Sequence, residues 1–128
     1  MPQYMLLIYT PAEGGPPPEE LEAQMPKWFE YTQALQDSGA FVSGDALQPV
    51  DSATTVRVRG GETLTTDGPF AETKEILGGY YIIDVADLDA ALDWAAKMPS
   101  APYGSTEVRP VWVFDQEEAG ASQSSAQA

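Results

Sequence analysis

The residues best suited to chemistry are concentrated in one short stretch, Asp67-Gly68-Pro69-Phe70-Ala71-Glu72-Thr73-Lys74-Glu75, which lies between two expected strands. Asp67 and Glu72 are candidate catalytic residues, because a positioned carboxylate can act as a general acid or base. Lys74 lies beside them and could bind an anion. A cluster of mixed charge next to an apolar sheet face can shift pKa values and hold a polar ligand.

Two arginines are expected to serve the same site. Arg57 and Arg59 alternate along the strand expected at residues 54–59, so both side chains share one face. Arg109, Asp45 and Tyr81 could join them through the sheet. A guanidinium binds carboxylates and phosphates in a bidentate manner, so a small polar or anionic ligand is the expected class. The candidate substrate-binding residues are Arg57, Arg59, Lys74, Tyr81 and Arg109.

Both parts of this interpretation have a purely structural alternative. The Asp67 carboxylate can accept hydrogen bonds from backbone amides at Phe70 or Ala71, and Gly68 can take the positive φ angle of a turn. The arginines can pair with nearby acids such as Glu62 and Glu107. Such surface ion pairs contribute only about 0 to 1 kcal/mol.

The composition narrows the available chemistry. The chain has no cysteine and no histidine, which excludes a thiolate nucleophile, a thiolate zinc site and an imidazole base. We predict no metal site, because Lys74 lies among the carboxylates and would oppose the charge of a cation. Gly78-Gly79 predicts a bulge or a close backbone approach, but no nucleotide-binding motif accompanies it. We therefore expect no cofactor.

The net charge of −14 opposes binding to nucleic acids and to anionic membranes. The first nine residues carry no basic segment, and their apolar run is too short to span a bilayer. We expect a cytoplasmic protein that binds neither nucleic acid nor membrane directly.

The elements that must position these residues alternate between strand and helix. Strands are expected at residues 3–9, 41–47, 54–59, 62–66, 76–85 and 105–114. Gly60-Gly61 predicts a tight hairpin turn. A helix is expected from Glu19 to a C-cap at Gly39, with a kink or restart at Pro26, and a second helix after an Asp87 cap. The expected buried stripes are Leu21, Met25, Trp28, Thr32 and Leu35 in the first helix and Leu88, Ala91, Leu92 and Ala95 in the second.

This order predicts an α+β fold, a ferredoxin-like split βαβ sheet with an added β-hairpin. Residues 1–114 are expected to form one domain, and residues 115–128 an acidic, then Ala/Ser/Gln-rich, mobile tail. Two helices can cover only one face of such a sheet, yet several strands are apolar on both faces. We therefore predict a homodimer in which two sheets face each other. The alternative is that the hairpin folds over that face within one chain.

The Asp67 to Glu75 motif, Gly78-Gly79-Tyr80-Tyr81 and Tyr4-Met5-Leu6-Leu7-Ile8-Tyr9 resemble the DGPF branch of the YCII-related bacterial proteins. The resemblance covers residues 3–114 and implies a dimeric α/β barrel. YCII-related proteins outside this branch resemble enzymes with a His/Asp pair, which this chain lacks on the histidine side. Some relatives are associated with alternative sigma factors. The resemblance therefore implies either a small-molecule enzyme with carboxylate chemistry or a non-catalytic ligand-binding or regulatory accessory protein.

Overall fold

The computed structural model describes residues 2–69, 74–112 and 114 and has an α+β architecture with two antiparallel sheets. The larger sheet has the strand order β2-β5-β1-β6, formed by β1 (Gln3–Pro11), β2 (Phe41–Ala46), β5 (Glu75–Asp84) and β6 (Ser105–Pro110). The smaller sheet is a hairpin of β3 (Thr54–Arg59) and β4 (Glu62–Asp67). The helices are α1 (Pro18–Ala23), α2 (Met25–Asp37) and α3 (Leu88–Ala96), with a short 3₁₀ turn, η1 (Val50–Ser52), before the hairpin.

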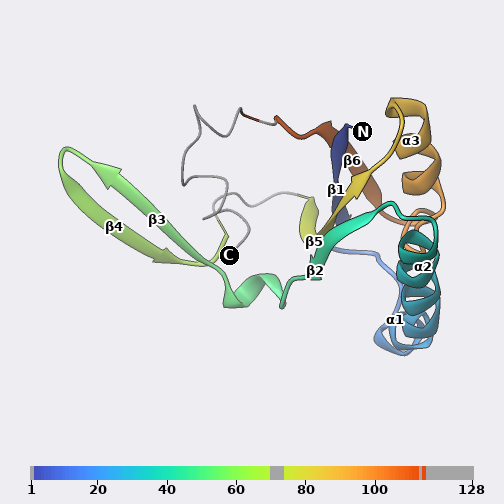
Figure 1. Ribbon diagram of the computed structural model, residues 1–128. Coiled ribbons are helices and arrows are strands. Elements are labelled where there is room, and N and C mark those ends of the chain that lie inside the picture. Colours follow the sequence, from blue (N-terminus) through green and yellow to red (C-terminus); the bar gives the residue numbers. More distant parts are fainter. Residues whose placement is uncertain (1, 70–73, 113, 115–128) are drawn as a thin grey trace.

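The three α-helices cover one face of the four-stranded sheet (Figure 1). Strand β1 lies between β5 and β6, and its alternate residues Tyr4, Leu6 and Ile8 are buried. A strand projects successive side chains to opposite faces. Met5 and Leu7 therefore lie on the other face, where they are half-buried. The core is formed by Tyr4, Leu6, Ile8, Tyr31, Leu35, Ala40, Ile83, Val85, Ala91 and Met98.

The first helical segment breaks where Pro26 predicted a restart. Helix α1 ends at Ala23 and α2 begins at Met25, with the proline in its first turn, where a missing N–H has no cost. The predicted stripe is correct for Leu35, which is buried, but wrong for Leu21 and Met25, which are exposed. The restart at Pro26 interrupts the helical periodicity, so the stripe does not continue back into α1.

Helix α3 begins at its predicted cap, where the Asp87 carboxylate accepts a hydrogen bond of 2.9 Å from the Ala90 amide. Its predicted stripe is partly wrong, because Leu88 and Leu92 are exposed. Ala91 is fully buried, and Trp94 is partly buried and packs against the core. The helix therefore contacts the sheet through alanine and tryptophan, not through its two leucines.

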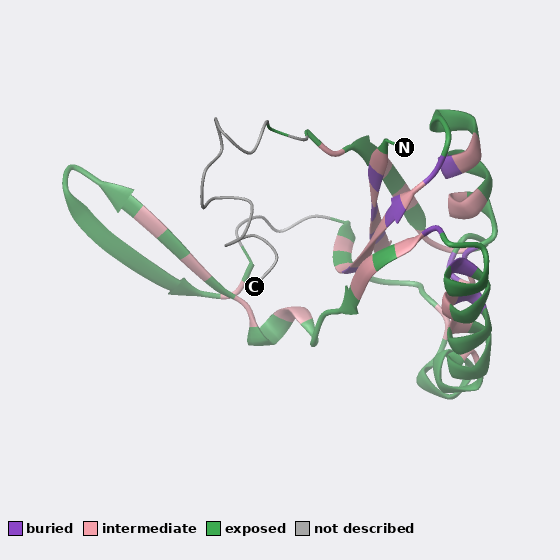
Figure 2. Cartoon of the chain, viewed as in Figure 1, coloured by how far each residue is buried: buried purple, intermediate pink, exposed green. Residues whose placement is uncertain are grey.

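The hairpin turn is confirmed, since Gly60 and Gly61 have φ angles of +58° and +81°. Neither hairpin strand pairs with the four-stranded sheet. The hairpin extends from the side of the sheet opposite the helices (Figure 1) and is largely exposed (Figure 2). It projects away from the sheet and does not lie flat on it. The last strand ends at Pro110, four residues before the predicted boundary.

The buried end of α2 provides a test of this packing. Leu35 has an exposure of 0%, so Leu35→Ala should lower the free energy of unfolding by about 3 kcal/mol through lost burial and a residual cavity. Leu92→Ala makes the same chemical change in α3 at a site that is 46% exposed, and should cost less than about 1 kcal/mol. Urea denaturation measures both. Equal losses would contradict the described packing of α2.

Candidate ligand-binding site

The predicted charged residues of the hairpin lie at different places along it. Asp67 is the last residue of β4 and pairs with Thr54 at the base, whereas Arg59 pairs with Glu62 beside the turn. Five residue steps along a strand separate these two positions by about 17 Å. Asp67 and Arg59 are therefore at opposite ends of the hairpin.

The remaining residues of the charged motif are only partly described. Lys74 is exposed immediately before β5, and Glu72 lies outside the described residues, as do the expected turn contacts at Phe70 and Ala71. Gly68 has the expected positive φ, +104°. Its amide donates to the Ala53 carbonyl at 2.7 Å, and its carbonyl accepts from the Thr55 hydroxyl at 2.8 Å. These two bonds fasten the start of the motif to the base of the hairpin.

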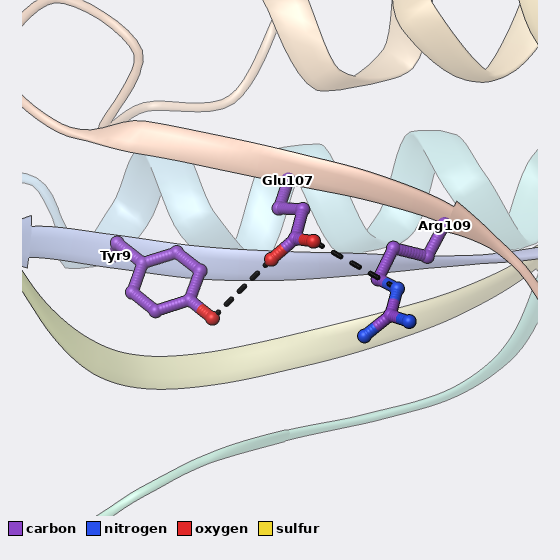
Figure 3. Close-up of polar contacts among 3 residues, drawn as sticks. All are labelled: Tyr9, Glu107 and Arg109. Atoms are coloured by element: carbon purple, nitrogen blue, oxygen red, sulfur yellow. Dashed lines mark hydrogen bonds and ion pairs between the residues drawn. The ribbon is translucent and has the colours of Figure 1, made fainter. Parts of the chain in front are cut away.

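Arg109 lies on the face of the sheet that carries no helices. Its Nε is 3.7 Å from Oε2 of Glu107, and the Tyr9 hydroxyl donates to Oε1 of the same carboxylate at 3.4 Å (Figure 3). The pairing of Arg109 with Glu107 is the structural alternative considered from the sequence. We name this surface, formed by Met5, Leu7, Tyr9, Tyr80, Ile82, Glu107 and Arg109, the helix-free face.

Tyr81 lies on the opposite face, beneath α2. Its hydroxyl shares a 2.6 Å hydrogen bond with the Thr32 hydroxyl. Its ring stacks on Trp28 at a centroid distance of 6.5 Å and an interplanar angle of 17°, and meets Tyr31 and Phe41 edge to face. The sheet thus separates Tyr81 from Arg109, and the predicted substrate-binding residues are divided between two faces and the hairpin.

Next to Tyr81 the structure contains a cavity of about 390 Å³ on the helix side of the sheet. It lies between α2 and strands β1, β2 and β5, which supply most of its lining. Its lining is mainly apolar and consists of Ile8, Thr10, Met25, Trp28, Phe29, Thr32, Phe41, Gly44, Asp45, Ala46, Gly78, Gly79, Tyr80, Tyr81, Ser100 and Tyr103. None of the described residues of the Asp67 to Glu75 motif lines this cavity.

Two glycines allow the strands that form the cavity floor to fit together. A Cβ atom on Gly79 would lie 2.9 Å from the Asp45 carbonyl oxygen, and one on Gly44 would lie 2.6 Å from the Tyr81 ring. Neither position can carry a side chain without a shift of its neighbours. The close backbone approach expected at Gly78-Gly79 is confirmed, and the adjacent register shift opposite Ile8 and Tyr9 is the expected bulge. Gly78-Gly79 is the sequence feature that could have located the cavity, because both residues line it.

The side chains that face the cavity are uncharged. Asp45 is the one charged residue among the described residues that line it, and its carboxylate accepts a 2.7 Å hydrogen bond from the Tyr80 hydroxyl. Tyr80 directly precedes Tyr81 in β5 and pairs with Leu7, so its side chain points to the helix-free face. The Asp45 carboxylate, which is bonded to Tyr80, is therefore directed to that face too.

The polar groups around the cavity are hydroxyls. The Thr32 and Tyr81 hydroxyls bond to each other, and the Tyr103 hydroxyl donates to Oε1 of Gln24 at 2.9 Å. Burial, with a smaller effect of Glu20, raises the pKa of Tyr103, so its phenol remains neutral at physiological pH. The Ser100 hydroxyl is buried and has no hydrogen-bond partner within the described part of the chain. The site can offer hydrogen bonds but no countercharge.

The family model for the YCII-related domain matches residues 2–115, so the chain belongs to the YCII-related family. An uncharacterized protein of Rhizobium meliloti (strain 1021) is 51% identical over 70 residues, which is 53% of this chain and 56% of that protein. The match thus spans about half the length of that relative. A solved structure of 5-chloro-2-hydroxyhydroquinone dehydrochlorinase from Burkholderia phenoliruptrix AC1100, in complex with 2,5-dihydroxybenzoquinone, is 14% identical. It covers 89% of this chain and 97% of its own, with a TM-score of 0.45.

Within the described residues, the helices are too short or too polar to cross a membrane.

Tyr31, which supports the aromatic wall of the cavity, gives a pH-dependent prediction. Burial and the neighbouring Tyr81 raise its pKa well above the ordinary value of 10.0, and its hydroxyl donates to the Trp94 carbonyl at 2.6 Å. The unfolded chain therefore ionises Tyr31 first as the pH rises. The contribution of this group to stability is complete below pH 10 and is lost above it, by about 1.4 kcal/mol per pH unit.

Tyr31→Phe should lower the free energy of unfolding by about 1 kcal/mol at pH 7, because one hydrogen bond is lost. The difference from the wild type should vanish or reverse by pH 11. Urea denaturation at both pH values measures it. A difference that stays constant with pH would contradict the burial of this phenol.

Proposed function

We propose that this chain is a ligand-binding domain that receives a small, uncharged and largely apolar molecule in the cavity beside Tyr81. One observation supports this most strongly: a cavity of about 390 Å³, walled by Trp28, Phe29 and Phe41, in whose described lining Asp45 is the one charged residue. Small-molecule sites typically measure about 300 to 1,000 Å³ and combine apolar walls with a few polar groups.

The expected size and shape of the ligand follow from the walls. The Trp28 and Tyr81 rings lie nearly parallel, and Met25 and Phe29 project at the cavity margin with exposures of 47% and 68%. Such large exposed apolar groups commonly mark a binding surface. A single aromatic ring with one hydroxyl fits this combination, because the ring can pack on Phe29 while the hydroxyl bonds to Thr32 or Tyr103.

Catalysis on an anionic substrate remains a second proposal. Asp67 and Lys74 are both exposed, at the two ends of the loop that joins β4 to β5, and are accessible to a solute. Asp67 and Glu72 would act as acid and base, and Lys74 and Arg57 would hold the anion, whereas Arg59 lies about 17 Å along the hairpin from Asp67 and would not reach it. Neither Lys74 nor Arg57 lines the cavity, so this activity would use a separate site.

We further propose that the domain functions as a ferredoxin-like homodimer, a dimeric α/β barrel. The strand order β2-β5-β1-β6, with α2 and α3 on one face, supports the ferredoxin-like part. The helix-free face supports the dimer, because Met5, Leu7 and Ile82 are apolar and only half-buried there. A second copy would cover these residues with the same face of its own sheet.

Ligand charge provides the test of the cavity proposal. Benzyl alcohol and benzoate share one ring and differ in charge, and we expect benzyl alcohol to bind at least 10-fold more tightly, because burying an unpaired carboxylate is costly. Ligand-observed NMR titration measures both. Met25→Ser/Phe29→Ser should weaken binding of benzyl alcohol by at least 10-fold through lost apolar contact.

The matched control is Leu88→Ser/Leu92→Ser, since these leucines are about as exposed as Met25 and do not line the cavity. This control should leave the affinity unchanged. Tighter binding of benzoate, abolished by Lys74→Gln, would support the second proposal and overturn the first.

A further inference from the structure

The hairpin of residues 54–67 carries an exposed apolar stripe that nothing covers within the described chain. Val56 and Val58 are 60% and 59% exposed, and they share one face because they alternate along β3. Their cross-strand partners Thr65 and Thr63 extend this face with further β-branched side chains. A two-stranded hairpin with no third strand and no packed face is marginally stable in water. The stripe is therefore a surface that a partner would stabilise.

The direction of the hairpin identifies the partner. The hairpin projects on the side of the sheet opposite the helices (Figure 1), which is where a second copy would sit on the helix-free face. Six residues per strand give the hairpin a length of about 20 Å, whereas packed sheets lie about 10 Å apart. A hairpin of this length reaches past the facing sheet and lies alongside the second copy.

We propose that the hairpin is a clasp that packs its Val56–Val58 stripe against a second copy of this chain. This inference rests on the proposed homodimer and adds the surface that secures it. It is independent of the ligand proposed for the cavity.

The clasp is tested by the dimer dissociation constant, measured by sedimentation over a range of concentrations. Val56→Ser/Val58→Ser should raise this constant at least 10-fold, because it removes apolar area that becomes buried on association. Leu88→Ser/Leu92→Ser, the matched control on α3, should leave it unchanged. Both pairs are exposed in one chain, so both variants should fold, which circular dichroism checks.

A second measurement places the hairpin directly. The chain has no cysteine, so Val58→Cys and Leu92→Cys each accept one environment-sensitive fluorophore. Addition of excess unlabelled protein should shift the emission of the Val58→Cys label to the blue and leave the Leu92→Cys label unchanged. The clasp alone would be overturned by a dimer whose dissociation constant is unchanged in Val56→Ser/Val58→Ser and whose Val58→Cys label shows no shift in emission. A wild-type protein that stays monomeric at every concentration would overturn the homodimer as well.

Discussion

The contact between Tyr81 and helix α2 is the interaction on which the rest of this structure depends. The Tyr81 ring stacks on Trp28, meets Tyr31 edge to face and shares its hydroxyl with Thr32. Aromatic pairs of this kind stabilise by about 0.5 to 1.5 kcal/mol beyond their buried area. Together they hold α2 over β5. The cavity lies next to Tyr81, where Gly78 and Gly79 of the same strand have no side chains to fill the space. The cavity is a consequence of this placement.

The same contact explains why the floor of the cavity is built from glycine. Gly44 lies opposite Tyr81 in the sheet, and a side chain there would overlap the tyrosine ring. Gly79 lies so close to the backbone of β2 that a side chain there would overlap the Asp45 carbonyl oxygen. Replacement of either glycine would displace the strands that carry Asp45 and Tyr81. The shape of the cavity is therefore coupled to the pairing of β2 with β5.

The sheet also separates charge from apolar surface. On the helix side, hydroxyls are the polar groups around the cavity, and the aromatic rings supply its walls. On the helix-free face, Tyr9, Glu107 and Arg109 form a chain of polar contacts between half-buried apolar residues (Figure 3). In a protein with a charge of −14, Asp45 is the one charged residue in the described lining of the cavity. This division is consistent with the proposed apolar ligand on one side of the sheet and the proposed second copy on the other.

Local signals in the sequence predicted most of the elements, while contacts distant in sequence determined the site. Gly60-Gly61, Pro26 and Asp87 each act within one turn of chain, and each produced the expected hairpin, restart or cap. The exposure of Leu92 was not predictable, because it depends on which side of α3 meets the sheet. Tyr81 and Arg109 were grouped from sequence, yet strand register places them on opposite faces. The cavity needs Gly44, Gly79 and α2 together, and no local pattern joins those three.

The most direct test of the central claim is the position of a bound neutral ligand. Nuclear Overhauser contacts should be recorded between benzyl alcohol and the methyl groups of the protein. We predict contacts from the ring protons to the methyl groups of Ile8 and Met25, which line the cavity, and none to those of Leu88 or Leu92 on α3. Contacts confined to Val56 and Val58 on the hairpin, with none to Ile8 or Met25, would contradict it.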